Sequence, residues 1–299
     1  MKMEMYFQSC CGEEDPYYMD NLYLTHANGF VPQSLNLGHP EVRDNSQKRA
    51  NQSGTFDFTQ HHGASAVQIT VALAPELMET PLTETALLDK LKRWTNPYSR
   101  SYLIYREQGE VDWRKILIRN ANSNRNISLV RSEFGNVSLT FRAPKGISES
   151  YEEVTVPLSF NGLESGRTYD LTFDRTYPAS NIIGLREVIN LGSTEAYPRL
   201  RIYGPCSGFR CENVTTGKTL WFKDAFTLLA NEYLVIDFEE GTVYMNGDPT
   251  NQRYSELKIT EADYDWWKLV CGVNMVRAVA TTFTSPQAHM DLSYNHSYI

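Results

Sequence analysis

The strongest constraint on the fold comes from a stretch between Asn190 and Asn274 in which apolar and polar residues alternate. In residues 199–203, leucine and isoleucine alternate with arginine and tyrosine; in residues 233–238, leucine, isoleucine and phenylalanine alternate with tyrosine, valine and aspartate. A period of two places the apolar side chains on one face of a β-strand and the others on the opposite face. The stretch therefore predicts strands that each turn one face toward a core.

Turn residues separate these predicted strands. Gly204-Pro205 ends the first run, and Val-Thr-Thr-Gly at 214–217 forms a four-residue connection in which Gly217 can adopt a positive φ. Glu239-Glu240-Gly241 is typical of a type I turn that ends in a left-handed glycine. Together these features predict an antiparallel meander. Its predicted core consists of Ile202, Leu220, Phe222, Leu234, Ile236, Phe238, Val243, Met245 and one of Trp266 and Trp267.

The first half of the chain predicts strands around a single helix. The helix is expected from Pro81 to Trp94, with Thr80 as its N-cap and proline at the first helical position. Its apolar stripe is Leu87, Leu88, Leu91 and Trp94. The polar stretch Arg43–Gly54 predicts a surface loop, or an arm that orders on assembly. Strands are predicted at 66–73, 101–106, 115–119, 126–131 and 137–143.

A chain of 299 residues favours two domains. Pro144-Lys145-Gly146 and the serine- and glutamate-rich segment after it are typical of a joint, which predicts domains over 1–146 and 147–299. The many short strands and frequent turns after the joint predict a β-sandwich. Besides the meander, strands are expected there at 154–160, 168–173, 182–191, 273–280 and 288–298.

Composition excludes several classes of function. The net charge of −8 lies in the second half, which argues against binding of a nucleic-acid backbone there. No apolar run is long enough for a membrane span or a signal peptide, so we expect no contact with a membrane. The odd number of cysteines predicts free thiols in a reducing cytoplasm, although Cys206 and Cys211 could meet across a turn. The cysteines are Cys10, Cys11, Cys206, Cys211 and Cys271.

No catalytic motif stands out. His61-His62, with Asp57 and His39 nearby, could form a metal cluster, but histidines in a polar loop are more often solvated. Nucleophile-elbow, zinc-protease and phosphate-loop patterns do not occur. We therefore predict no catalytic residue, no metal and no cofactor.

The order of turn and strand-end residues in the second half resembles that of the distal tail proteins, or minor tail proteins, of long-tailed siphovirus-type phages. Each residue alone is common, but together they span the stretch from Asn190 to Asn274 in a fixed order. The residues that carry the resemblance are Asn190, Gly192, Pro198, Gly204, Pro205, Asn213, Thr216, Gly217, Asp237, Gly241, Asn246, Gly247, Gly272 and Asn274.

The resemblance implies a mainly β protein in which residues 1–146 form a belt domain and residues 147–299 form a galectin-like antiparallel β-sandwich. It implies a structural role and not catalysis: a homo-hexameric ring at the virion tail tip, assembled in the host cytoplasm. The implied partners are the tail tube protein, the tail-associated hub protein and receptor-binding proteins, with DNA only passing through the channel.

Two alternatives remain open at this point. The second domain could recognise a host glycan, because aromatic rings stack on sugars; the candidate residues are Trp221, Trp266 and Trp267, and binding is assigned to Trp221 and Trp267. A cell-wall hydrolase would need a pair of carboxylates in a cleft, and the sequence offers no means of placing such a pair.

Overall fold

The computed structural model describes residues 3–9, 20–40, 42–43, 47–48, 55–56, 61–78, 82–94, 101–107, 109–120, 130–131, 136–160 and 184–299. It divides into two compact units, Met1–Tyr151 with Tyr298–Ile299, and Glu152–Ser297. Several predictions lie outside the described residues: the N-cap at Thr80, the strand at 168–173, Cys10, Cys11 and Asp57. The predicted mainly β fold with one α-helix is confirmed in the described part of the chain.

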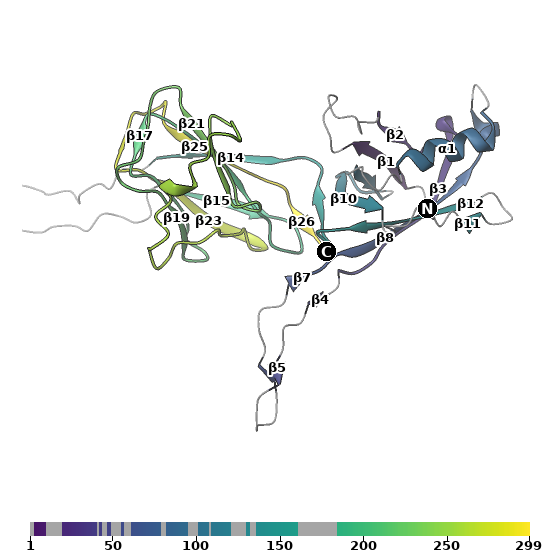
Figure 1. Ribbon diagram of the computed structural model, residues 1–299, viewed down its shortest axis with the longest axis horizontal. Coiled ribbons are helices and arrows are strands. Elements are labelled where there is room, and N and C mark those ends of the chain that lie inside the picture. Colours follow the sequence, from purple (N-terminus) through teal and green to yellow (C-terminus); the bar gives the residue numbers. More distant parts are fainter. Residues whose placement is uncertain are drawn as a thin grey trace, which may run out of the picture. The chain divides into compact units, whose positions relative to one another are not determined.

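The first unit is built on an antiparallel sheet with the strand order β2-β1-β9-β10-β12-β8-β3 (Figure 1). Its strands are β1 (Glu4–Ser9), β2 (Leu22–Tyr23), β3 (Phe30–Leu37), β8 (Ser65–Leu73), β9 (Ser101–Arg106), β10 (Arg114–Asn120) and β12 (Asn136–Ala143), joined by β11 (Val130–Arg131) on β12 and β13 (Ser148–Ser150) on β10. Two 3₁₀ turns, His26–Asn28 and Pro75–Leu77, flank β3 and β8. Strand β12 pairs with β8 over the whole length of β12, from Ser65↔Ala143 to Ala72↔Asn136.

Short strand pairs occupy the region of the predicted polar loop. Strand β4 (Val42–Arg43) pairs with β7 (His61–His62), and β5 (Gln47–Lys48) pairs with β6 (Thr55–Phe56). Both pairs are antiparallel (Figure 1). The other residues of Arg43–Gly54 lie outside the described part.

Helix α1 (Glu84–Trp94) packs its apolar stripe into the core of the first unit. Leu87, Leu91 and Trp94 are buried in one cluster with the inward residues of the sheet, and the ring of Trp94 stacks on Phe7 at 5.5 Å. Leu88 is half-buried against the same cluster. The predicted stripe is therefore confirmed, whereas the predicted helix start at Pro81 is wrong.

The helix begins later because Thr83 caps it. The backbone N–H of Ala86 donates to Thr83 Oγ1 at 3.2 Å, and that of Leu87 donates to the Thr83 carbonyl at 3.1 Å. A threonine that accepts from the third residue of a helix satisfies a donor with no partner inside the helix. Glu84 stands in the first turn and Lys92 and Arg93 in the last, as the helix dipole favours.

We expect Thr83→Ala to destabilise the first unit by about 1 kcal/mol, because the N–H of Ala86 loses its partner. Amide hydrogen exchange of the helix should speed up correspondingly. Thr85→Ala is the matched control: Thr85 is exposed within the helix, and alanine there should leave exchange unchanged or slow it. Equal protection in both variants would rule out the cap.

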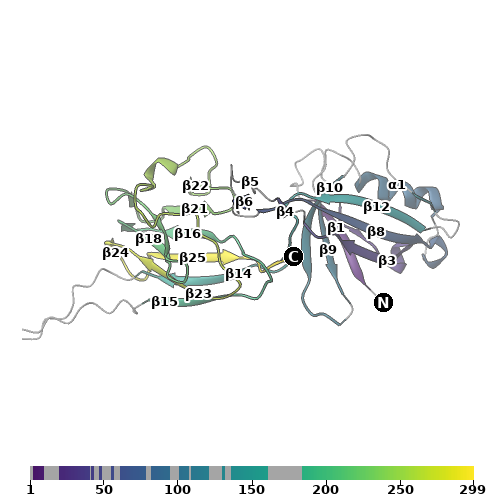
Figure 2. The same cartoon turned by 90° about the horizontal axis from the view of Figure 1, so that it is seen from below.

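The second unit consists of antiparallel sheets that pack face to face. One has the order β14-β25-β16-β21-β22 and another the order β15-β23-β18-β19, with a three-stranded sheet β20-β17-β24 beside them (Figure 2). The strands of the five-stranded sheet are β14 (Val154–Ser159), β16 (Arg199–Tyr203), β21 (Tyr233–Asp237), β22 (Thr242–Met245) and β25 (His289–Tyr294). Those of the four-stranded sheet are β15 (Leu185–Asn190), β18 (Arg210–Asn213), β19 (Lys218–Trp221) and β23 (Gly272–Val279). The remaining elements are β17 (Cys206–Ser207), β20 (Thr227–Leu228), β24 (Thr282–Phe283) and a 3₁₀ turn at Tyr254–Glu256. Strand β26 (Ser297–Tyr298) pairs with β13 in the sheet that contains β1.

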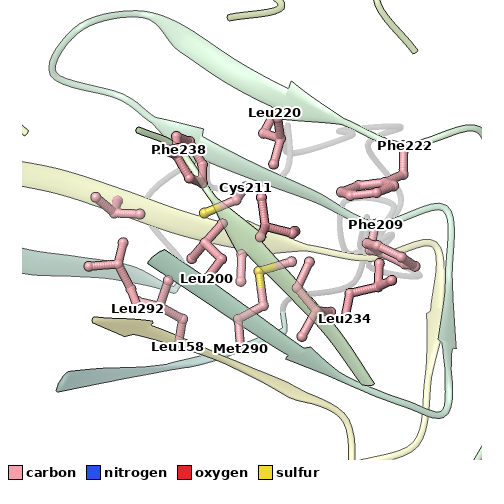
Figure 3. Close-up of a cluster of buried hydrophobic side chains, with 14 of the residues drawn as sticks. Leu158, Leu200, Phe209, Cys211, Leu220, Phe222, Leu234, Phe238, Met290 and Leu292 are labelled. Carbon is pink, nitrogen blue, oxygen red and sulfur yellow. The ribbon is translucent and has the colours of Figure 1, made fainter. Parts of the chain in front are cut away.

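The predicted core is confirmed. All eight aliphatic, phenylalanine and methionine residues named for it are buried in one cluster, and of the two tryptophans it is Trp267 that joins them. Figure 3 shows Leu200, Leu234, Met290 and Leu292 of the five-stranded sheet turned toward Cys211 and Leu220 of the four-stranded sheet. The apolar residues that recur at every second position of the sequence thus line the space between the two sheets.

Candidate functional site

Three buried asparagines make hydrogen bonds to one stretch of backbone, residues 268–270. The amide nitrogen of Asn190 donates to the Leu269 carbonyl at 3.3 Å, and that of Asn213 donates to the Lys268 carbonyl at 3.1 Å. Asn274 accepts from the Val270 N–H at 3.0 Å and donates to the Val270 carbonyl at 2.8 Å. We call these three side chains with the backbone of 268–270 the asparagine clamp.

The sheet register brings the clamp together. Asn190 ends β15 and pairs with Gly272; Asn274 lies in β23, the next strand; Asn213 ends β18 and pairs with Val276 of β23. The three asparagines therefore come from neighbouring strands. An asparagine carries both donors and an acceptor, so each can bind the clamped backbone and also its own turn. The N–H of Gly192 donates to Asn190 Oδ1 at 3.0 Å, and the N–H of Thr216 donates to Asn213 Oδ1 at 3.3 Å.

Burial makes these bonds structurally important. Asn190 is 1% exposed, and Asn213 and Asn274 are fully buried. A buried backbone group without a partner costs free energy comparable to a lost hydrogen bond. Leu269 exchanges two backbone hydrogen bonds with Ala196, so the asparagines matter most for the carbonyl of Lys268 and for the N–H and carbonyl of Val270.

Two other predicted motif residues, Asp237 and Gly241, fix the hairpin between β21 and β22. Asp237 Oδ1 accepts from the N–H groups of Glu239 and Glu240, at 2.9 and 3.1 Å, and Asp237 Oδ2 lies 2.9 Å from the guanidinium of Arg199. Gly241 completes the turn with φ +64°. Asn246, at the far end of β22, has φ +54° and accepts from the N–H of Tyr233 at 3.0 Å.

The other predicted motif residues lie at turns or close approaches. Gly192 packs against the backbone of Ser297, where an added Cβ would lie 1.9 Å from the Ser297 carbonyl oxygen. Pro198 precedes β16 and accepts from the N–H of Phe238 at 3.3 Å. The rest are Gly204 and Pro205 after β16, Thr216 and Gly217 between β18 and β19, Gly247 after β22 and Gly272 at the start of β23.

The structure separates the two tryptophans proposed to bind glycan. Trp267 is 2% exposed, its ring contacts Phe238, and its N–H donates to the Cys211 carbonyl at 3.3 Å. A ring enclosed in this way offers no face to a sugar, so the assignment of glycan binding to Trp267 needs correction. Trp221 is half-buried, with its N–H bound to Asp263 Oδ1 at 2.9 Å and the guanidinium of Arg210 above its ring at 4.5 Å.

Sequence reasoning missed two parts of this unit. The role of the backbone of 268–270 as the partner of the three asparagines could not be predicted, because main-chain groups are the same in every residue. The charged residues Arg210, Glu212 and Arg277 were also missed, although Arg210 and Glu212 stand two apart in a strand and so share a face.

No group of three metal-ligating side chains occurs among the residues that the structure describes, and the side chains of His61 and His62 lie outside that set. Cys206 and Cys211 are buried free thiols, and Cys271 is an exposed one. Burial raises the pKa of the Cys206 thiol to about 12, and burial with the nearby Glu212 charge raises the pKa of the Cys211 thiol further. In the described part of the chain, no helix has the length and apolar character of a membrane span.

These pKa shifts predict a reactivity pattern and a pH dependence. At pH 8 a thiol reagent should modify Cys271 in the native protein, and Cys206 and Cys211 only after unfolding, as read by peptide mass spectrometry.

The unfolded state ionises these two thiols above about pH 8.5 while the folded state keeps them protonated. The two thiols should therefore leave the free energy of unfolding of the second unit unchanged below that pH and lower it as the pH rises toward 12. Rapid native labelling of Cys206 would contradict the burial.

Comparisons with known proteins agree with the predicted resemblance. Residues 191–298 match the family model described as the siphovirus-type tail component, C-terminal domain. The structure of the SPP1 phage Dit protein, described as a paradigm of the hub adsorption apparatus in phages that infect Gram-positive bacteria, matches with a TM-score of 0.60 and 12% identity over 99% of each chain. The phage P2 baseplate, in its activated conformation with calcium, matches with a TM-score of 0.43 and 10% identity over 98% of each chain. Comparison with curated protein sequences gave no match.

The family model covers every motif residue except Asn190, including the clamp residues Asn213 and Asn274, and it describes a component of phage tails. The SPP1 match shows that the whole chain has the Dit fold. Residues 191–298 thus match the C-terminal domain of siphovirus-type tail components, and the chain as a whole resembles the distal tail proteins of long-tailed phages.

Proposed function

We propose that six copies of this chain form a ring at the tip of a phage tail, joining the tail tube to the hub and anchoring adhesion proteins at the rim. The observation that carries the proposal is the family match over residues 191–298 on a chain with the Dit fold throughout. The chain would assemble in the host cytoplasm and function in the virion, and DNA would pass through the ring.

The sheet of the first unit has a feature that supports the proposed ring. A closed ring of identical subunits uses a heterologous interface, in which one surface meets a different surface of the next copy. Within the described residues, the sheet ends in two unlike edges, the two-residue strand β2 and the eight-residue strand β3. Strand β3 carries a register shift between Pro32 and Ser34, a feature that discourages unlimited edge-to-edge pairing.

The second unit has features that would let it act as a rigid support for other proteins. Its antiparallel sheets enclose one continuous core, and the asparagine clamp fixes the loop that precedes β23. We propose that the belt role belongs to residues 1–146 and that residues 147–299 form the galectin-like domain that holds tip and adhesion proteins. The motif residues then preserve the shape of that domain and contact no substrate.

The copy number tests the proposal. Purified protein, alone and mixed with the tail tube protein, would be analysed by native mass spectrometry. We expect a species of six chains, with tube protein joining it. Tail particles should contain the chain in multiples of six relative to a single-copy tip protein. The ring would be contradicted if the purified chain stayed monomeric under all conditions and the particles contained another copy number.

A further inference from the structure

Three charged side chains form a network on the outer face of the four-stranded sheet. Glu212 of β18 pairs in register with Arg277 of β23, and Arg210 lies two residues before Glu212. Arg210 Nε donates to Glu212 Oε1 at 2.6 Å, and Arg277 Nε donates to Glu212 Oε2 at 2.8 Å. Both oxygens of one carboxylate are therefore used by two guanidinium groups. We call these three residues the arginine–glutamate network.

The network is partly withdrawn from water and carries one more positive charge than negative. The side chains of Arg210, Glu212 and Arg277 are 17%, 12% and 20% exposed. Charge-assisted hydrogen bonds are stronger at such sites than in open solvent, because screening is weaker. The neighbouring carboxylates offset this excess: Glu261 and Asp224 lie 2.8 and 3.8 Å from the ammonium group of Lys258, and Asp263 accepts from the N–H of Trp221 at 2.9 Å.

Trp221 fixes the orientation of Arg210. The two residues pair directly across β18 and β19, and the guanidinium carbon lies 4.5 Å from the centre of the indole ring. The ring is itself held by the bond from its N–H to Asp263. The planar guanidinium is thus positioned by its bond to Glu212 and by its contact with the ring.

This arrangement leaves donors available. An arginine has five N–H donors, and only the Nε–H of Arg210 donates to any residue within the described part of the chain. Its two terminal nitrogens form a fixed fork beside an aromatic ring. Such a fork matches a carboxylate or phosphate, which can accept two parallel hydrogen bonds.

We propose that the Arg210–Trp221 pair is a binding subsite for an oxyanion, a phosphate or carboxylate group, in which the terminal nitrogens of Arg210 donate both hydrogen bonds. Trp221 acts as the support under the guanidinium, so the ligand binds at the edge of Arg210 and does not stack on the indole. The proposal depends only on the second unit and stands apart from the ring.

Titration calorimetry of the full chain at constant ionic strength tests the subsite. The probes are inorganic phosphate, glycerol 3-phosphate and glucuronate, with chloride as the blank; the phosphate probes and glucuronate separate a phosphate source from a carboxylate source. We expect saturable binding of at least one probe with a Kd of about 1 mM or tighter. Arg210→Gln should weaken binding by about tenfold or more, because a bond to a charged group is lost.

Two further variants make the result decisive. Arg210→Lys keeps the charge beside Glu212 but lacks the planar fork, so it should fold normally and still bind several-fold more weakly. Arg186→Gln removes an exposed arginine from β15 of the same sheet and should bind like the wild type. No saturable binding of any probe, unchanged binding by Arg210→Lys, or an equal loss in Arg186→Gln would each overturn the subsite.

Discussion

Replacing Asn274 by alanine is expected to destabilise the second unit by about 3 kcal/mol or more. The side chain is fully buried, and its removal takes the only hydrogen-bond partner from the Val270 N–H that the described structure provides. The Val270 and Gly272 carbonyls lose a donor at the same time. Each buried polar group left unsatisfied costs about 1–3 kcal/mol.

Urea unfolding followed by tryptophan fluorescence measures this loss, since Trp267 lies in the affected core. Asn251→Ala is the matched control: Asn251 is a half-buried asparagine of the same unit whose side chain makes no hydrogen bond to the residues that the structure describes. It should change stability by about 0.5 kcal/mol or less. A cost below about 1 kcal/mol for Asn274→Ala would show that the clamp is dispensable.

Gly192→Ala should destabilise the same unit by about 3 kcal/mol. The new Cβ would lie 1.9 Å from the Ser297 carbonyl oxygen and 2.6 Å from its nitrogen, and both are backbone atoms that cannot rotate away. Thr194 also donates its N–H to the Ser297 carbonyl at 3.1 Å, so moving that strand would break a further bond.

Gly217→Ala separates crowding from backbone strain. Gly217 has φ +68°, but an added Cβ there meets nothing within 4 Å. Only the left-handed conformation is penalised, so we expect a loss of about 1–2 kcal/mol. Thermal unfolding of both variants would compare the two costs, and a Gly192→Ala variant as stable as Gly217→Ala would contradict the close approach at Ser297.

The strands and the core could be predicted because they depend on local patterns. Alternation in residues 199–203 and 233–238 fixes which side chains share a face, and Gly241 fixes where the hairpin turns. These features require no knowledge of distant residues. The same holds for the helical stripe of Leu87, Leu91 and Trp94.

The partners of the motif residues could not be predicted, because they are distant in sequence. Asn190 binds the carbonyl of Leu269, which lies 79 residues away. Alternation also could not decide between Trp266 and Trp267, since adjacent residues point to opposite faces and either could be the inward one. The helix start was misplaced because threonine occurs at both 80 and 83, and only the fold shows that Thr83 is the cap.

Cryo-electron microscopy of the intact phage tail tip tests the central claim most directly. The account predicts a sixfold ring below the last tube ring, with the sheet and helix of residues 1–146 in its belt and six β-sandwiches of residues 147–299 outside it. A tip in which this chain occupies density of another symmetry, or in which the belt density fits a different protein, would contradict the account.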